Sequence, residues 1–270
     1  YPNAYAQTCQ LPSYSTVYND GDFDTFKAAL QDYAQKIQGN GELGIDYYPY
    51  TEETAGFWDQ ILGKVETENG IRKGWLGTMQ CVAQTAINNN LDFENTIQSH
   101  AMSKGYTQVS AAELALQMHV SVGFGAKRLS YFTYNKHDES NDLTMTQYIA
   151  GDATLAEAVK TANAVGDNMT GAMTWFQYSK SKVYGSSTKR LNLDNLIQSE
   201  LTKNIISSAS GSVLVNEFYN EFTGEYGYYI INITIPDNNT SVTVNLTSAA
   251  TVYQGTSNKK ASSVTLAAGE

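Results

Sequence analysis

The sequence predicts an α/β protein in which a parallel sheet is followed by a small antiparallel β module. Strand-like and helix-like segments alternate four times over about the first 180 residues. After about residue 205 only short strand-like segments remain, separated by turn residues. Alternating strands and helices are typical of a parallel sheet, whereas strands joined by turns pair antiparallel. We therefore expect an α/β region over 1–180, a connector over 181–204 and a β-sandwich domain over 205–270.

Each predicted strand of the α/β region is a short segment that precedes a loop and a helix. The expected strands are 1–6, 43–48, 74–83 and 128–134. A long polar loop is expected over 84–108, and a loop of that length suggests a functional segment.

The predicted helices have apolar residues at helical spacing and recognisable ends. Asp22 is the expected N-cap of the first helix, and Ser110 with Glu113 forms the capping box of the third. The expected helices are 23–38, 54–68, 111–122 and about 153–176.

The C-terminal segments alternate in the manner of strands with one buried face. Val242, Val244 and Leu246 fall on one side of the segment 241–247, and hydroxyl and amide side chains fall on the other. Further strands are expected near 212–215 and 228–235, with turns at Gly224, at 236–239 and at Gly255.

Composition and charge exclude several classes of partner. The 270 residues carry a formal net charge of −10 and a sequence pI near 4.8, which disfavours nucleic acid and anionic membrane surfaces. No apolar stretch is long enough to cross a membrane as a helix. The 19 tyrosines suit a groove that stacks sugar rings, although they also suit a core. Cys9 and Cys81 are expected to be two buried thiols, although one disulfide bridge is the open alternative.

Amide, carboxylate and aromatic side chains occupy the predicted strand ends. In a parallel α/β sheet the carboxyl ends of the strands meet at one edge, where ligands bind. Amides and carboxylates bind hydroxyl groups and aromatic faces stack on sugar rings, so we expect a carbohydrate partner. The candidate substrate-binding residues are Asn3, Tyr48, Gln80, Tyr131 and Tyr134.

Asp46 is the candidate catalytic residue because it leaves the sheet directly after an apolar run. A carboxylate in that position needs partners or a shifted pKa. It could equally be a structural acid that anchors the next loop, and Gln80 could equally be a core amide. The segment His137-Asp138-Glu139 is interpreted as a solvated loop, and we expect neither a metal site nor a cofactor.

Five motifs together resemble one family. They are IDYYPY at 45–50, GFW at 56–58, W-x-x-x-x-Q at 75–80, S-A-A-E-x-x-x-Q at 110–117 and GFGAKRLSYFTY at 123–134. This set resembles bacterial glycoside hydrolase-like proteins of the broad β-galactosidase-type (β/α)8-barrel superfamily. The segment 264–270, VTLAAGE, resembles the ending of their terminal β-sandwich.

The resemblance implies a partial TIM-type barrel of about four βα units followed by the β-sandwich, and a role on O-glycosidic bonds. The four strands would be the fifth to eighth of the barrel, so the chain is interpreted as a fragment that lacks the first barrel half and its general acid. Gln80 stands where relatives carry a nucleophilic glutamate, which puts the two-glutamate mechanism in doubt. A secreted, periplasmic or cell-surface location is expected.

An incomplete barrel would expose strand edges, so we expect a homodimer through those strands. Two alternatives remain open at this point. The chain could be a noncatalytic carbohydrate-binding protein, or an open flavodoxin-like sheet with an unrelated small-molecule role.

Overall fold

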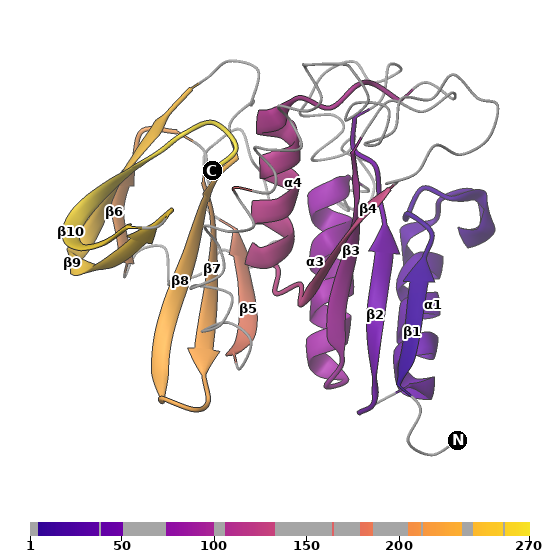
Figure 1. Ribbon diagram of the computed structural model, residues 1–270. Coiled ribbons are helices and arrows are strands. Elements are labelled where there is room, and N and C mark those ends of the chain that lie inside the picture. Colours follow the sequence, from indigo (N-terminus) through magenta and orange to yellow (C-terminus); the bar gives the residue numbers. More distant parts are fainter. Residues whose placement is uncertain are drawn as a thin grey trace.

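The computed structural model describes residues 5–37, 39–50, 74–99, 106–132, 164, 179–185, 205–211, 213–233, 240–255 and 257–270. These residues form a parallel α/β unit and an antiparallel β region beside it (Figure 1). The predicted helices at 54–68 and about 153–176, the loop 135–147 and the turn 236–239 lie outside the described residues, apart from residue 164.

The parallel sheet has four strands in the order β1-β2-β3-β4. Their bounds are β1 Ala6–Gln10, β2 Gly41–Asp46, β3 Asp92–Gln98 and β4 Arg128–Phe132. All three pairings are parallel, with Thr8 opposite Leu43 and Asn95 opposite both Ile45 and Leu129. A side chain at Gly44 would collide with the carbonyl oxygen of Thr8, which explains the glycine in the middle of β2.

Three helices of the described residues belong to this unit, and two of them have the N-terminal caps that the sequence predicts. Asp22 Oδ1 accepts a hydrogen bond of 2.6 Å from the Thr25 backbone N–H. Ser110 and Glu113 form a reciprocal capping box, with N···O distances of 3.2 and 2.7 Å. The helices are α1 Phe23–Lys36, α3 Trp75–Asn88 and α4 Ala111–Gly123.

Two of the predicted strands were wrong. Residues 74–83 belong to α3, where Trp75, Met79, Val82 and Ala86 share one buried face at helical spacing. A short apolar run can form either a strand or a buried helix, and here the spacing of three and four residues decides for the helix. The third strand is β3, inside the segment expected to be a loop over 84–108.

The first strand is β1 at Ala6–Gln10 rather than 1–6. Its sequence, AQTCQ, has no large apolar residue, so alternation gave no signal there. Residues 1–4 lie outside the part of the chain that the structure describes.

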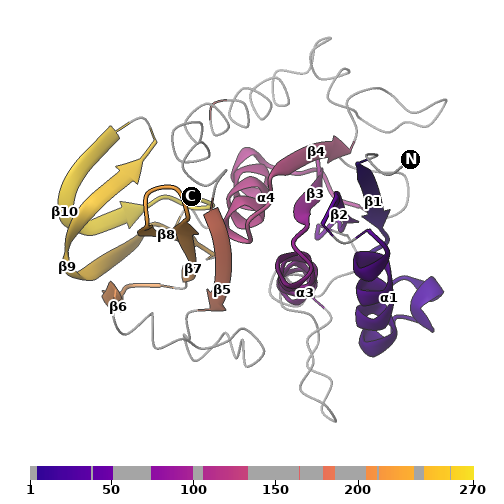
Figure 2. The same cartoon turned by 90° about the horizontal axis from the view of Figure 1, so that it is seen from below.

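All three helices pack on the same face of the parallel sheet. Leu43, Ile45 and Phe93 share one buried cluster with side chains of each helix. On the same face, Asn95 Nδ2 donates a 2.8 Å hydrogen bond to Ser121 Oγ of α4. Figure 2 shows α1 and α3 on one side of the strands. The residues that alternate with these in each strand therefore point to the opposite face of the sheet.

The antiparallel region consists of two three-stranded sheets, ordered β10-β9-β6 and β5-β7-β8. The strands are β5 Ser179–Gly185, β6 Ile206–Ala209, β7 Val213–Asn220, β8 Glu225–Asn232, β9 Val242–Gln254 and β10 Ser257–Leu266. Because β5 pairs with β7, residues 181–185 of the expected connector lie in a strand.

A small core of valines joins the two antiparallel sheets. Val242 and Val244 are fully buried and Leu246 packs beside them, as the alternation predicts. They contact Val213 and Val215 of the other sheet. The turns at Gly224 and Gly255 have positive φ values of 73° and 55°, a conformation that favours glycine.

The antiparallel region packs directly on the α/β unit. Leu214, Ile231 and Ile233 belong to the same buried cluster as the helices. His119 Nδ1 of α4 and the Tyr229 hydroxyl of β8 are 2.6 Å apart, and a Cβ on Gly123 would lie 2.5 Å from Ile231 Cδ1. The two regions therefore share one interior.

We predict that Ile231→Ala destabilises the protein by about 2–5 kcal/mol, because it opens a cavity in the interior that both regions share. Ile231 is completely buried. Urea unfolding followed by circular dichroism measures the change in the free energy of unfolding.

The matched control is Val17→Ala, since Val17 is 62% exposed. Its effect should stay within about 0.5 kcal/mol. Equal effects of the two substitutions would contradict a shared interior.

Candidate functional site

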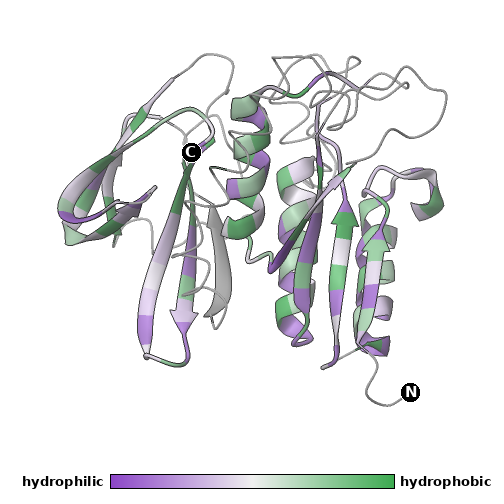
Figure 3. Ribbon diagram, viewed as in Figure 1, coloured by the Kyte–Doolittle hydropathy of each residue, from purple (hydrophilic) through white to green (hydrophobic). Residues whose placement is uncertain are grey.

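The face of the parallel sheet opposite the helices carries polar side chains, and we call it the polar face. Strand side chains alternate between faces, so the residues next to Leu43 and Ile45 in β2 point away from the helices. Figure 3 shows the resulting alternation of hydrophobic and hydrophilic residues along β2. The polar face comprises Gln7, Cys9, Glu42, Asp46, Glu94, Thr96, Arg128 and Ser130.

Toward the amino ends of the strands, the polar face holds a pair of buried glutamates. Glu42 and Glu94 are 2% and 4% exposed. Gln7 Nε2 donates a 2.6 Å hydrogen bond to Glu94, and the Ser130 hydroxyl donates a short one to it. Arg128 Nη1 lies 3.5 Å from Glu42 Oε1.

The two neighbouring glutamates have pKa values that are shifted in opposite directions. Burial and the neighbouring Glu94 raise the pKa of Glu42 to about 7. Burial alone would also raise the pKa of Glu94, but hydrogen bonds from Glu42, Ser130 and Gln7 outweigh it, so that pKa is lowered. Below about pH 7 the proton of the pair therefore resides mainly on Glu42, while Glu94 is charged. Both glutamates are thus engaged with each other and with Gln7, Ser130 and Arg128. No sequence pattern pointed to these five residues.

Asp46 lies at the carboxyl end of β2, on the same face. Burial raises its pKa to about 6, although a hydrogen bond to its own backbone opposes the shift. Its Oδ1 atom is buried and has no hydrogen-bond partner among the described residues. A buried carboxylate oxygen without a partner costs free energy, so it is a natural acceptor for a ligand hydroxyl.

Cys9 of β1 lies near Asp46 on the polar face. Its thiol pKa is raised to about 11, first by burial and then by the negative charges of Asp46 and Glu94. Both cysteines are free thiols, but Cys9 is exposed and Cys81 half-buried, so the expected burial of both was wrong.

Aromatic side chains surround Asp46 at the carboxyl ends of the strands. We call Tyr14, Tyr47, Tyr48, Tyr106 and Phe132 the tyrosine rim. The Tyr48 ring centroid is 5.9 Å from that of Tyr106 and 5.4 Å from that of Phe132. Tyr14 stacks edge-on against Tyr47 at 5.1 Å, and its hydroxyl is 3.2 Å from the Tyr106 hydroxyl.

The tyrosine rim is partly open to solvent and electrically coupled to Asp46. Tyr14 is 43% exposed, and Tyr48 is half-buried. Burial, and to a lesser extent the charge of Asp46, raises the pKa of Tyr14 and Tyr48 well above their ordinary value. Both phenols therefore stay protonated at neutral pH and can donate hydrogen bonds.

Gln98 fixes the loops that carry the rim. It is fully buried at the end of β3, where its Oε1 accepts from the Tyr50 N–H at 3.0 Å. Its Nε2 donates to the carbonyls of Tyr50 and Thr107 at 2.9 and 3.0 Å. The Gln117 side chain in turn makes two 2.9 Å hydrogen bonds to the Gln98 backbone. These bonds fix the backbone at Tyr50 and Thr107, close in sequence to Tyr48 and Tyr106, relative to the end of β3.

The structure brings together only some of the residues singled out from the sequence. Asp46 and Tyr48 lie at the same end of the sheet, on or beside the polar face. Tyr131 faces the helices instead, with its hydroxyl 3.7 Å from Met118 Sδ. Gln80 lies within α3, on the opposite side of the sheet. The prediction that it contributes to this site was therefore wrong. Asn3 and Tyr134 lie outside the described residues.

Tyr14 and Tyr106 were not predicted as site residues because β1 and β3, the strands that precede them, were placed wrongly along the sequence. Tyr14 follows β1, and Tyr106 follows β3. Had those two strands been placed correctly, both tyrosines would have counted as strand-end residues.

Comparisons with known proteins leave the family open. No protein-family model matches the chain, and no curated protein or solved structure is significantly similar to it. In the part of the chain that the structure describes, no helix has the length and hydrophobicity to cross a membrane. Within the same residues, no group of three or more histidine, cysteine or carboxylate side chains is arranged to hold a metal ion.

We predict that Gln98→Ala lowers the free energy of unfolding by at least about 2 kcal/mol. The substitution removes three hydrogen bonds of the Gln98 side chain, to the N–H and carbonyl of Tyr50 and to the carbonyl of Thr107, at roughly 0.5–1.5 kcal/mol each. Urea titration is the measurement. Gln35→Ala, on the exposed side of α1, is the matched control and should be nearly neutral. A neutral effect of Gln98→Ala would show that the loops are held by other contacts.

We predict that Asp46→Asn stabilises the protein above pH 6 and not below pH 4. The folded pKa of Asp46, about 6, exceeds its ordinary value of 3.8, so the native state binds this proton more tightly. The stability that this proton contributes is complete below about pH 4 and is lost as the pH rises through 6. Asparagine avoids that loss, by about 1 kcal/mol once solvent screening of the half-buried carboxylate is allowed for.

Thermal unfolding of both proteins between pH 4 and pH 8 measures this difference. Asp20→Asn is the control, because Asp20 is exposed and has a positive φ of 57° that asparagine also adopts. A difference between wild type and Asp46→Asn that does not change with pH would contradict a raised pKa.

Proposed function

We propose that this is a carbohydrate-active protein that binds a sugar at the tyrosine rim and uses Asp46 as an acid. The observation that carries the proposal is the buried Oδ1 of Asp46, which has no partner among the described residues and lies beside partly exposed tyrosines. A carboxylate oxygen accepts hydrogen bonds from sugar hydroxyls, and aromatic faces cover the apolar side of a sugar ring.

The charge balance supports a neutral ligand. The chain carries a net charge of −10, and Asp46 is itself acidic, so phosphorylated or nucleic acid ligands would be repelled. The phenols of Tyr14 and Tyr48 remain protonated and supply donors, so the rim offers both donors and acceptors to hydroxyl groups.

The topology supports a segment of a (β/α) barrel as the finer description of the α/β unit. The strand order β1-β2-β3-β4 follows the chain without reversal, and all three described helices lie on one face. A doubly wound, flavodoxin-like sheet instead places helices on both faces and reverses its strand order. Barrel enzymes bind substrate at the carboxyl ends of their strands, which is where the tyrosine rim lies.

The chemistry proposed for Asp46 is proton donation to a glycosidic oxygen. With a pKa of about 6 the carboxyl group is protonated in mildly acidic solution and can transfer its proton as the bond to the anomeric carbon breaks. Water then adds its hydroxyl group to that carbon and gives up a proton to a second carboxylate. Asp46 would supply one of the two carboxyl groups.

A noncatalytic binding role is the second candidate, and one observation favours it. The other buried carboxylates of the polar face, Glu42 and Glu94, are engaged with each other and with Arg128, Gln7 and Ser130. Within the described residues, the rim therefore offers Asp46 without a free carboxylate partner. Binding at the tyrosine rim is common to both candidates.

We predict that Tyr48→Ala weakens sugar binding about tenfold, which corresponds to roughly 1.4 kcal/mol of lost stacking. Isothermal titration with cello-, xylo-, malto- and chito-oligosaccharides measures the affinity. Asp46→Asn should retain binding within a few fold but reduce hydrolysis of p-nitrophenyl glycosides by about 10²–10⁴-fold if Asp46 is the acid.

Asp20→Asn is again the matched control and should change neither readout. Loss of binding in Tyr48→Ala together with no hydrolysis by the wild type would select the noncatalytic role. Wild-type affinity and turnover in both Tyr48→Ala and Asp46→Asn would reject the proposed site.

A further inference from the structure

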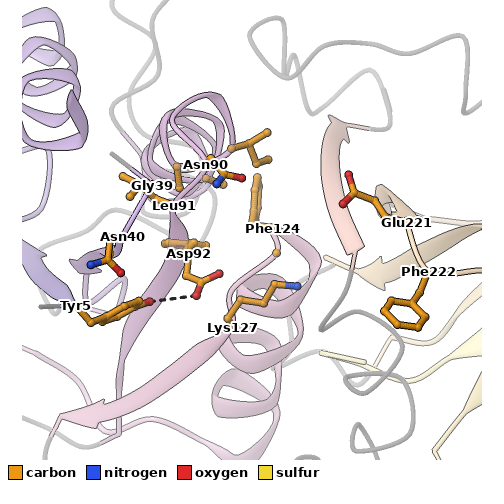
Figure 4. Close-up of a pocket in the computed structure, with 16 residues that line it drawn as sticks. Tyr5, Gly39, Asn40, Asn90, Leu91, Asp92, Phe124, Lys127, Glu221 and Phe222 are labelled. Carbon is orange, nitrogen blue, oxygen red and sulfur yellow. Dashed lines mark hydrogen bonds between the residues drawn. The ribbon is translucent and has the colours of Figure 1, made fainter. Parts of the chain in front are cut away.

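A second hollow lies at the opposite end of the parallel strands from the tyrosine rim. Its volume is about 390 Å³, and it is lined by the turns that lead into β2, β3 and β4 and by the turn between β7 and β8. The strands of the sheet are five to seven residues long, so about 20 Å separates the two places. Figure 4 shows the hollow, with Tyr5, Asn40, Asn90, Asp92 and Lys127 on the α/β side and Phe222 on the hairpin side.

The α/β side of the hollow combines apolar residues, among them Ile87, Leu91 and Phe124, with donors and acceptors of several kinds. The Tyr5 hydroxyl donates a 3.1 Å hydrogen bond to Asp92 Oδ2, which holds the phenol at the edge of the hollow. Asn40 and Asn90 present amides from the turns before β2 and β3. Lys127 extends toward the hairpin, and burial lowers the pKa of its ammonium group.

The hairpin side presents an aromatic ring on a fixed turn. Phe222 is 85% exposed, although a phenylalanine normally gains free energy by burial. Asn220 Oδ1 accepts hydrogen bonds from the N–H groups of Phe222 and Thr223 at 2.9 and 3.2 Å, and Gly224 closes the turn at a φ of 73°. The turn therefore fixes the backbone that carries the ring, and preorganisation of this kind favours binding.

The strands of the same hairpin carry two more exposed aromatic residues. Tyr219 and Tyr226 face each other across the hairpin with ring centroids 4.9 Å apart, and they are 37% and 60% exposed. Cross-strand aromatic pairs stiffen a hairpin, so they support the position of Phe222. Exposed aromatic residues gathered on one hairpin are typical of an interaction surface.

We propose that this hollow is a second carbohydrate-binding site, in which Phe222 covers a sugar ring while Tyr5, Asp92 and the two asparagines bind its hydroxyl groups. The mixture of polar and apolar side chains suits a sugar, and the carboxylates of Asp92 and Glu221 disfavour an anionic ligand. The ligand class rests on the proposed function, but the site does not share any residue with the tyrosine rim. A polysaccharide held at both places would gain avidity.

Depletion binding to insoluble cellulose, chitin, xylan and starch tests this site. Phe222→Ala should weaken binding of the recognised polysaccharide at least fivefold, and Asn90→Ala should weaken it in the same direction. Tyr253→Ala is the matched control, because Tyr253 is 69% exposed on a different strand, β9, and should not change binding. Circular dichroism confirms that each variant is folded.

The variants separate this inference from the proposed function. Weaker polysaccharide binding in Phe222→Ala, with unchanged affinity for short oligosaccharides at the tyrosine rim, supports the second site. Wild-type binding by Phe222→Ala and Asn90→Ala, while Tyr48→Ala is impaired, overturns the second site alone. Weakened binding in Phe222→Ala with none of the expected loss in Tyr48→Ala overturns the rim and keeps the hollow. Failure of every polysaccharide to bind overturns the second site, whereas the oligosaccharide titrations decide the rim separately.

Discussion

The two-residue alternation of the parallel strands is the constraint on which the rest of the structure depends. Leu43, Ile45 and Phe93 need apolar neighbours, and α1, α3 and α4 supply them from one side of the sheet. Every intervening residue must then point to the other side, whatever its polarity. That geometry forces Glu42, Glu94 and Asp46 onto one face and makes a buried polar site an outcome of the fold.

The three acids on that face reach different states because their neighbours differ. Glu42 is paired with Glu94 and lies 3.5 Å from Arg128, and Glu94 accepts hydrogen bonds from two neutral donors, Gln7 and Ser130. Asp46 is further along the strand and lacks such donors, which leaves it with a raised pKa and an unused acceptor. A buried polar group that its own fold does not satisfy is where a ligand gains most.

Sequence patterns predicted the elements that carry strong local signals. The N-cap at Asp22, the capping box at Ser110 and Glu113, and the alternation around Val242 and Val244 were all confirmed. β1 and β3 were misplaced because polar residues fill one of their faces, and α3 was taken for a strand because its apolar residues are nearly continuous. In α3 the spacing of three and four residues between the buried side chains marks the helix, whereas β1 and β3 offer no comparable apolar pattern.

The same errors limited the prediction of the site. Asp46 was found because it follows an apolar run that signals a strand end, and Tyr48 was found with it. The other tyrosines of the rim could not be predicted. Tyr14 and Tyr106 come from loops that follow strands with little hydrophobic signal. Gln80 was misassigned for the opposite reason, since its apolar neighbours belong to a helix.

The position of Cys9 gives the protein a built-in chemical reporter. Its thiol is exposed, yet its pKa of about 11 keeps the reactive thiolate scarce at neutral pH, and the charge of Asp46 contributes to that scarcity. The rate at which an alkylating reagent labels this sulfur therefore depends on whether the adjacent carboxyl group is ionised or covered. Occupancy of the rim can thus be followed through cysteine labelling, without engineering a probe into the chain.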